Sequence, residues 1–205
     1  MKIDPESQSR QDSSHLLSDI VVPRPIAWIS TVGTQGVFNL APFSAYGMVS
    51  SIPMIVSIGI STNRNGQKKD TLKNIELTKE FVINIVTEEL AETMNITCAP
   101  YPSDVSEFEK AGLTPKKADL VKAPMVAESP VNLECRLVQI IELGKMPAMT
   151  SLVIGSILRV HIRDEYYDKS NKRVTGLRTI ARLGGESDLY CRSNDTFEMK
   201  RPSLE

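Results

Sequence analysis

The 205 residues of the chain suit a single domain with elaborations, since two complete domains would be cramped in this length. The 24 Lys and Arg residues balance the 25 Asp and Glu residues, so no global positive field gathers nucleic acid or an acidic membrane surface. An anionic ligand must therefore be met by local groups.

The N-terminal residues 1–19 are polar and mixed in charge, without the apolar core of a signal peptide or the Arg-rich face of a transit peptide. This indicates a cytoplasmic protein, with an N-terminal extension over residues 1–20 and one domain over residues 21–205. Residues 25–63 carry no charged side chain, but Gly, Pro, Ser, Thr and Asn interrupt this stretch too often for a membrane span.

Cysteine and histidine give no metal signature. The three cysteines lie far apart and match neither a CxxC pair nor zinc-site spacings, so we expect reduced, mostly buried thiols. His15 and His161 are the only histidines and lie in no recognisable motif, so we expect no metal site and assign them no role.

The first half of the chain predicts strands and then a short helix. Residues 26–31 and 37–40 flank a turn and read as a hairpin, and residues 54–60 read as a buried strand. Residues 44–50 fit either a strand or an irregular loop. Asp70 is placed to cap a short helix whose Leu72 and Ile75 face inward.

The second half returns to strands after two helices. Residues 81–86 predict a strand, residues 87–97 a helix, and residues 104–111 a second helix closed by Gly112. Further strands are expected at 131–143, 152–163 and near 196–199. This order predicts a mainly β fold with short helices, in which the strands form an antiparallel barrel rather than βαβ units.

Two segments are candidates for ligand binding. No GxGxxG or Walker lysine loop is present, but Lys69, Asp70 and Thr71, with Arg64 in the preceding loop, join cationic and hydroxyl groups to a helix start that favours an oxyanion. The alternative is that Asp70 only caps its helix and the lysines are solvated.

The second segment, residues 39–44, combines an amide with small and apolar side chains that suit the edge and face of a flat heterocycle. A strand broken by proline is the alternative interpretation. Trp28, near Arg24, is able to shield or stack on an aromatic ligand, although burial in the core is the commoner fate of a tryptophan.

Taken in order, Pro23-Arg-Pro-Ile-Ala-Trp-Ile-Ser-Thr31, Asn39-Leu-Ala-Pro-Phe-Ser44 and Lys69-Asp-Thr71 resemble the flavin reductase-like proteins of the FMN-binding split-barrel superfamily, which includes flavoredoxin. The resemblance continues through residues 81–84, 108–115, 128–135 and 180–185, so it covers nearly the whole chain after residue 20. At Thr150-Ser151 the chain lacks a histidine that many relatives carry, so any role of that histidine does not transfer.

The resemblance implies a Greek-key split β-barrel that forms a homodimer, with FMN in a groove near the subunit interface. It places Lys69, Asp70, Thr71 and Arg64 at the phosphate and Arg24 and Trp28 beside the ring system. The remaining cofactor-binding residues that it implies, along the ring edge, the ribityl chain and the adjoining wall, are Asn39, Leu40, Ala41, Ser44, Ser57, Ile58 and Gly59.

The resemblance also implies an oxidoreductase that takes electrons from NADH or NADPH and passes them through FMN to a flavin, a metal centre or a small molecule. The cofactor performs this chemistry, so we predict no catalytic side chain. An FMN electron carrier reduced by a redox protein partner is the alternative. A flavin-free binding barrel is a third hypothesis, and the lack of a basic aromatic face argues against nucleic acid as its ligand.

Overall fold

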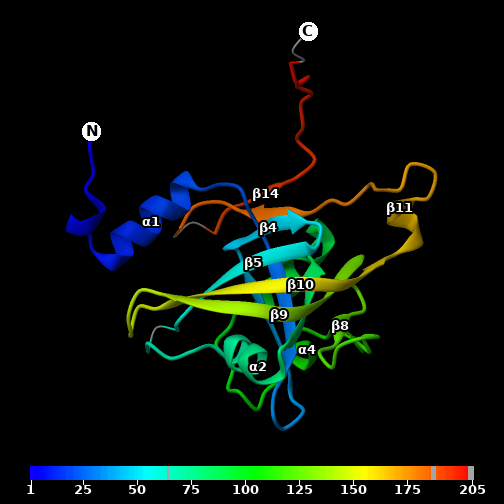
Figure 1. Ribbon diagram of the computed structural model, residues 1–205, viewed down its shortest axis with the longest axis horizontal. Helices are drawn as coiled ribbons and strands as arrows, with labels where there is room; N and C mark the ends of the chain where they lie inside the picture. The colour runs from blue at the N-terminus through cyan, green and yellow to red at the C-terminus, as the bar shows by residue number, and fades with distance from the viewer. Residues whose placement is uncertain (64, 186–187, 203–205) are drawn as a thin grey trace.

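The computed structural model describes residues 1–63, 65–185 and 188–202 (Figure 1). Its centre is a seven-stranded sheet in the order β3-β2-β6-β9-β10-β5-β4, in which every neighbouring pair is antiparallel. The strands are β2 (Ala27–Val32), β3 (Phe38–Phe43), β4 (Tyr46–Ser51), β5 (Met54–Ser61), β6 (Glu80–Ile85), β9 (Val131–Leu143) and β10 (Thr150–Ile162).

Short elements surround this sheet. The helices are α1 (Arg10–Ile20), α2 (Asp70–Thr78), α3 (Ala91–Ile96) and α4 (Glu107–Lys110), with 3-10 turns η1 (Pro5–Ser7), η2 (Glu88–Leu90) and η3 (Asp164–Tyr166). The short strands are β1 (Arg24–Pro25), β7 (Pro115–Lys116), β8 (Met125–Val126), β11 (Tyr167–Asp168), β12 (Arg173–Val174), β13 (Ile180–Arg182) and β14 (Tyr190–Arg192). Among the described residues, no helix is long and apolar enough to cross a bilayer.

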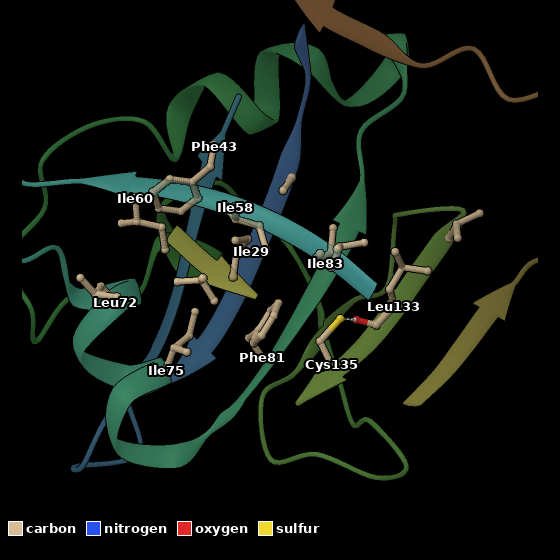
Figure 2. Packing of buried hydrophobic residues seen from close by; sticks show 14 residues of the cluster. Ile29, Phe43, Ile58, Ile60, Leu72, Ile75, Phe81, Ile83, Leu133 and Cys135 are labelled. Atoms are coloured by element: carbon tan, nitrogen blue, oxygen red, sulfur yellow. Dashed lines mark hydrogen bonds between the residues drawn. The ribbon is translucent and has the colours of Figure 1, made fainter. Parts of the chain in front are cut away.

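The largest hydrophobic cluster lies between the strands and α2 (Figure 2). Phe81 is fully buried, and Ile29, Ile58 and Ile83 join it from three other positions on the sheet. Leu72 and Ile75 close the cluster from α2, which confirms the predicted inward face of that helix. The helix is therefore held by its apolar face, while Asp70 of its first turn is half-buried and Lys73 is exposed.

The sheet confirms the predicted mainly β fold with short helices and antiparallel strands. The predicted hairpin is β2–β3, the strand at 131–143 is β9 with the same bounds, and the segment left open at 44–50 is the strand β4. Apolar and β-branched residues gave a reliable signal in β2 and in the first half of β9, because these segments are buried.

Several local predictions were wrong. Asp70 does not cap α2, because Lys69 is the N-cap residue and its side chain makes no capping hydrogen bond. The predicted helix at 87–97 is a 3-10 turn followed by α3, and the helix at 104–111 shortens to α4. Residues 196–199 form no strand. The helix α1 lies within the N-terminal extension predicted over residues 1–20, and the boundary of that extension stays a prediction.

Candidate functional site

A groove of about 920 Å3 lies between the end of β3, the start of α2 and residues 97–103. Its walls include five of the predicted ligand-binding residues, namely Asn39, Ala41, Lys69, Asp70 and Thr71. The size lies in the range of pockets that bury small ligands. The strand end and the helix start that the sequence singled out separately thus face one shared space.

Lys69 is the one cation among the described residues of this groove that has no carboxylate partner. Among the described residues no ion pair joins it, and its Nζ lies 5.3 Å from the centroid of the Phe43 ring. Partial desolvation by the surrounding protein lowers the pKa of Lys69, although the residue as a whole is exposed. An anionic ligand would relieve this cost, because it would supply the missing opposite charge.

The neighbouring Lys68 differs from Lys69 in this respect. Its Nζ lies 2.6 Å from Glu76 Oε1 and 3.4 Å from Glu142 Oε1. The hydrogen bond to Glu76 is the main cause that raises the pKa of Lys68. Two adjacent lysines therefore have different roles: Lys68 ties α2 to β9, and Lys69 is available to a ligand.

Asp70 and Thr71 complete the helix start. The Asp70 carboxylate accepts from Lys73 Nζ at 2.9 Å and from Ser103 Oγ at 2.9 Å, so its charge is balanced and it holds the 97–103 wall. The first-turn N–H groups of α2 have no side-chain cap. Such N–H groups and the helix dipole attract an anion, and Lys69 reinforces that attraction.

Asn39 connects the strand end to the helix start. Its Oδ1 accepts a hydrogen bond from Thr71 Oγ1 at 2.8 Å, and its Nδ2 donates to Glu107 Oε1 at 2.8 Å. The other Glu107 oxygen accepts from the backbone N–H of Leu40 at 2.9 Å. Burial is the main cause that raises the pKa of Glu107. Glu107 escaped the sequence analysis because it lies far from Asn39 in sequence and no motif marks it.

Asn63, Asn65 and Gln67 form another wall of the groove, and Gly66 packs against the β9–β10 turn. Asn63 Oδ1 accepts from the backbone N–H groups of Asn65 and Gln67. Gly66 has φ +73° and lies so close to Pro147 that a Cβ there would come within 2.5 Å of the proline Cβ. Glycine is required at this position for both its backbone conformation and its contact. Arg64, predicted at the phosphate, lies outside the described residues.

Trp28 lies in the core and not in the groove. Its side chain is fully buried, and Nε1 donates to Thr97 Oγ1 at 2.9 Å. Thr97 lines the groove, so Trp28 supports the wall from behind. A side chain without exposed surface has no face free to stack on a ligand, and core burial, the alternative interpretation, is what the structure shows.

The Arg24 side chain is hydrogen-bonded to backbone carbonyls. Its guanidinium donates to the carbonyls of Ser18, Val21 and Gly184, and so joins the end of α1 to the segment after β13. Arg24 does not line the groove as the described residues form it. Its expected contact with the ring system stays a prediction.

The other predicted residues do not line the groove as the described residues form it. The Leu40 and Ile58 side chains are fully buried, and Ser57 and Gly59 lie on the opposite face of β5 from Ile58. These four residues and Ser44 are absent from the groove walls formed by the described residues of the single chain. Their flavin contacts stay predictions that involve the outer face of β5 or backbone groups.

The cysteines are free but are not mostly buried, which corrects our expectation. Only Cys135 is buried, while Cys191 is half-buried and Cys98 is exposed along the groove. Partial desolvation by the surrounding protein raises the pKa of Cys98, although the residue as a whole is exposed, and burial raises the pKa of Cys135. Neither thiol is therefore activated as a thiolate.

His161 has a structural partner outside the groove, the buried carboxylate of Glu134. Glu134 is fully buried and accepts from His161 Nε2 at 2.5 Å and from the backbone N–H groups of Asp119, Leu120 and Val121. Burial alone would raise the pKa of Glu134, but these hydrogen bonds outweigh it and lower the pKa. Ligand atoms of Asp119, Glu134 and His161 lie within 4.8 Å of one another, yet the existing hydrogen bonds account for the cluster as a structural support.

Comparison with known proteins agrees with this fold. A model of the flavin reductase like domain matches residues 19–177. A protein of Aquifex aeolicus without a described function is 41% identical over 83% of this chain and 86% of its own. Nitrilotriacetate monooxygenase component B from Bacillus cereus superposes with a TM-score of 0.91 at 33% identity, over 97% of this chain and 98% of its own.

A third similar protein is a nitroreductase. The 2-nitrobenzoate 2-nitroreductase NbaA of Pseudomonas fluorescens superposes with a TM-score of 0.88 at 29% identity, over 100% of this chain and 98% of its own. With these comparisons, the fold assigns the protein to the flavin-binding split-barrel proteins. Within that class, the chain belongs to the flavin reductase-like family.

Proposed function

We propose that this protein is an FMN-dependent oxidoreductase that passes electrons from NADH or NADPH to a flavin, a metal centre or a small-molecule acceptor. The observation that carries the proposal is the single groove that joins Asn39 on β3 to Lys69 and Thr71 at the start of α2. The family and the oxidoreductase names of two structural relatives support the same class of chemistry.

The chemistry of the groove fits a flavin with one terminal phosphate. Lys69 and the uncapped N–H groups of α2 would hold the phosphate. Asn39 and Ala41, at the other side of the groove, would meet the ribityl chain or the edge of the ring. The lack of a competing carboxylate on Lys69 among the described residues is the specific feature of this chain that favours a phosphorylated ligand.

The bound cofactor would supply hydride and electron transfer, and this chain would supply its orientation and its hydrogen bonds. Hydride transfer from a nicotinamide requires no side-chain acid or base. We therefore assign no catalytic residue. The role of the protein is to hold the flavin with one face accessible to the nicotinamide and then to the acceptor.

We also propose that the protein works as a homodimer. The β4–β5 hairpin lies at the edge of the main sheet and exposes Met48, Val49, Ile52 and Met54, with Ile52 92% exposed. Apolar side chains gathered at an open sheet edge are typical of a surface that another chain covers. A second copy placed there would approach the outer face of β5, where Ser57 and Gly59 lie.

The test is a visible spectrum of the purified protein, with and without added FMN, before and after NADH or NADPH. We expect FMN to bind and its visible absorbance to bleach at the rate of nicotinamide oxidation. A tightly bound flavin with slow nicotinamide oxidation would instead indicate an electron carrier reduced by a protein partner. A colourless protein that leaves added FMN unchanged would refute the proposal.

A further inference from the structure

Glu107 is a buried carboxylate at the groove that the proposed chemistry does not use. The residue is 7% exposed and belongs to α4, a helix of four residues. Burying a carboxylate is costly unless hydrogen bonds compensate. Glu107 therefore needs strong partners, and it finds them on a different element, β3.

Both carboxylate oxygens of Glu107 bind consecutive residues of β3. Oε2 accepts from the backbone N–H of Leu40 at 2.9 Å, and Oε1 accepts from Asn39 Nδ2 at 2.8 Å. An ionised carboxylate has no hydrogen to donate. It can therefore bind only the NH2 side of the Asn39 amide, which sets the orientation of that amide.

This orientation decides what the other side of Asn39 can do. Its Oδ1 faces hydroxyl donors, at 2.8 Å from Thr71 Oγ1 and 3.4 Å from Thr31 Oγ1. Asn74 of α2 donates in turn to Thr31 Oγ1 at 2.9 Å. The network thus joins α4, β3 and the first turns of α2.

We propose that Glu107 is a positioning residue of the groove, because its carboxylate holds the Asn39 amide with Oδ1 towards Thr71 and leaves the second Nδ2 hydrogen for the ligand. This inference rests on the proposed function, since it concerns how the site receives FMN. It adds a residue that touches no ligand itself and acts through Asn39. With the amide fixed, the strand end and the helix start meet the ligand as one preorganised surface.

Glu107→Gln tests this orientation directly. Glutamine keeps the size of the side chain and can still accept from Leu40, but it turns an NH2 group towards Asn39 Nδ2. Two donors then face each other, so Asn39 must turn its amide. Its Oδ1 would then accept from the glutamine, its Nδ2 would donate to Thr71 Oγ1, and the second Nδ2 hydrogen would no longer point to the ligand. We expect FMN affinity to fall about ten-fold, the effect of one hydrogen bond. Glu109→Gln, on the exposed side of the same helix, is the matched control.

The double variant Asn39→Asp with Glu107→Gln separates positioning from folding. The introduced glutamine amide would then donate to the introduced aspartate carboxylate, and Thr71 would donate to the other oxygen of that carboxylate, so every bond of the network is restored. We expect the melting temperature to return towards that of the wild type. The FMN affinity should stay low, because the groove has lost the Asn39 N–H donor and the negative charge of the pair has moved from residue 107 to residue 39.

The measurements are flavin fluorescence titration and thermal unfolding of the wild type and of these variants. The inference is supported if Glu107→Gln binds FMN more weakly while Glu109→Gln does not, and if the double variant fails to restore the affinity. Unchanged affinity in Glu107→Gln, or an affinity that recovers together with the melting temperature in the double variant, overturns it. If the wild type itself fails to bind FMN, the proposed function falls, and with it this role.

Discussion

Replacing Lys69 by alanine removes the cation that the structure leaves for a phosphate. The change touches no ion pair among the described residues, because Lys69 has none, and it leaves the Asn39–Thr71–Glu107 network intact. The loss should therefore appear in ligand binding rather than in folding. Within the protein, the variant gives up the contact of Lys69 with the Phe43 ring.

The magnitude follows from one charged hydrogen bond, which contributes about 1.5–3 kcal/mol. Lys69 is exposed, so water and salt screen its charge and the lower part of this range applies. We expect the dissociation constant of FMN to rise about ten- to thirty-fold. Raising the salt concentration should weaken FMN binding more in the wild type than in the variant, because the screened interaction is present only in the wild type.

The assay is titration of FMN and of riboflavin by flavin fluorescence. Riboflavin lacks the phosphate, so its affinity should be the same in Lys69→Ala and in the wild type. Lys68→Ala is the matched control, because its cation is paired with Glu76 and Glu142 and should hardly affect either ligand. Equal loss of FMN and riboflavin affinity in Lys69→Ala, or no loss of either, would refute the phosphate assignment.

Three further predictions concern other parts of the molecule. The lowered pKa of Glu134 implies a stabilisation that is complete above the pKa of glutamate in the unfolded chain and is lost as pH falls through the lower folded pKa. Glu134→Gln should therefore cost about 1–3 kcal/mol in urea unfolding at about pH 7 and less at about pH 3, and a loss independent of pH would contradict this. Trp28 is the only tryptophan and is fully buried, so acrylamide should barely quench the emission of the apoprotein, whereas strong quenching would place the indole at the surface. Ile52→Asp puts a charge on the apolar β4–β5 hairpin and should convert the dimer to monomers in sedimentation velocity, and an unchanged dimer would move the interface elsewhere.

The strands and the two halves of the groove could be predicted because their signals are local. The β9 strand and the inward-facing Leu72 and Ile75 follow from patterns of neighbouring apolar residues. Lys69 and Thr71 follow from a cation and a hydroxyl beside a helix start. The groove shows that the two predicted segments line the same site.

The errors arise where a tertiary contact, which the local sequence does not reveal, determines the structure. Asp70 has the chemistry of an N-cap, but Lys73 and Ser103 bind its carboxylate and the helix begins one residue earlier than that role requires. Glu107 and the pair of His161 with Glu134 depend on partners far away in the sequence, so spacing gives no sign of them. Residues 196–199 are β-prone, but no neighbouring strand pairs with them among the described residues.

The contact between Gly66 and Pro147 links two distant parts of the chain into one structural unit. The carbonyl of Pro147 also accepts from Thr62 Oγ1 at 2.6 Å, so the turn after β9 supports the rim of the groove at two points. A redesign of loop 63–67 alone, aimed at a different ligand, would have to preserve these contacts with Pro147. Libraries that vary the loop and residues 145–149 together should yield more folded, altered binders than libraries that vary either segment by itself.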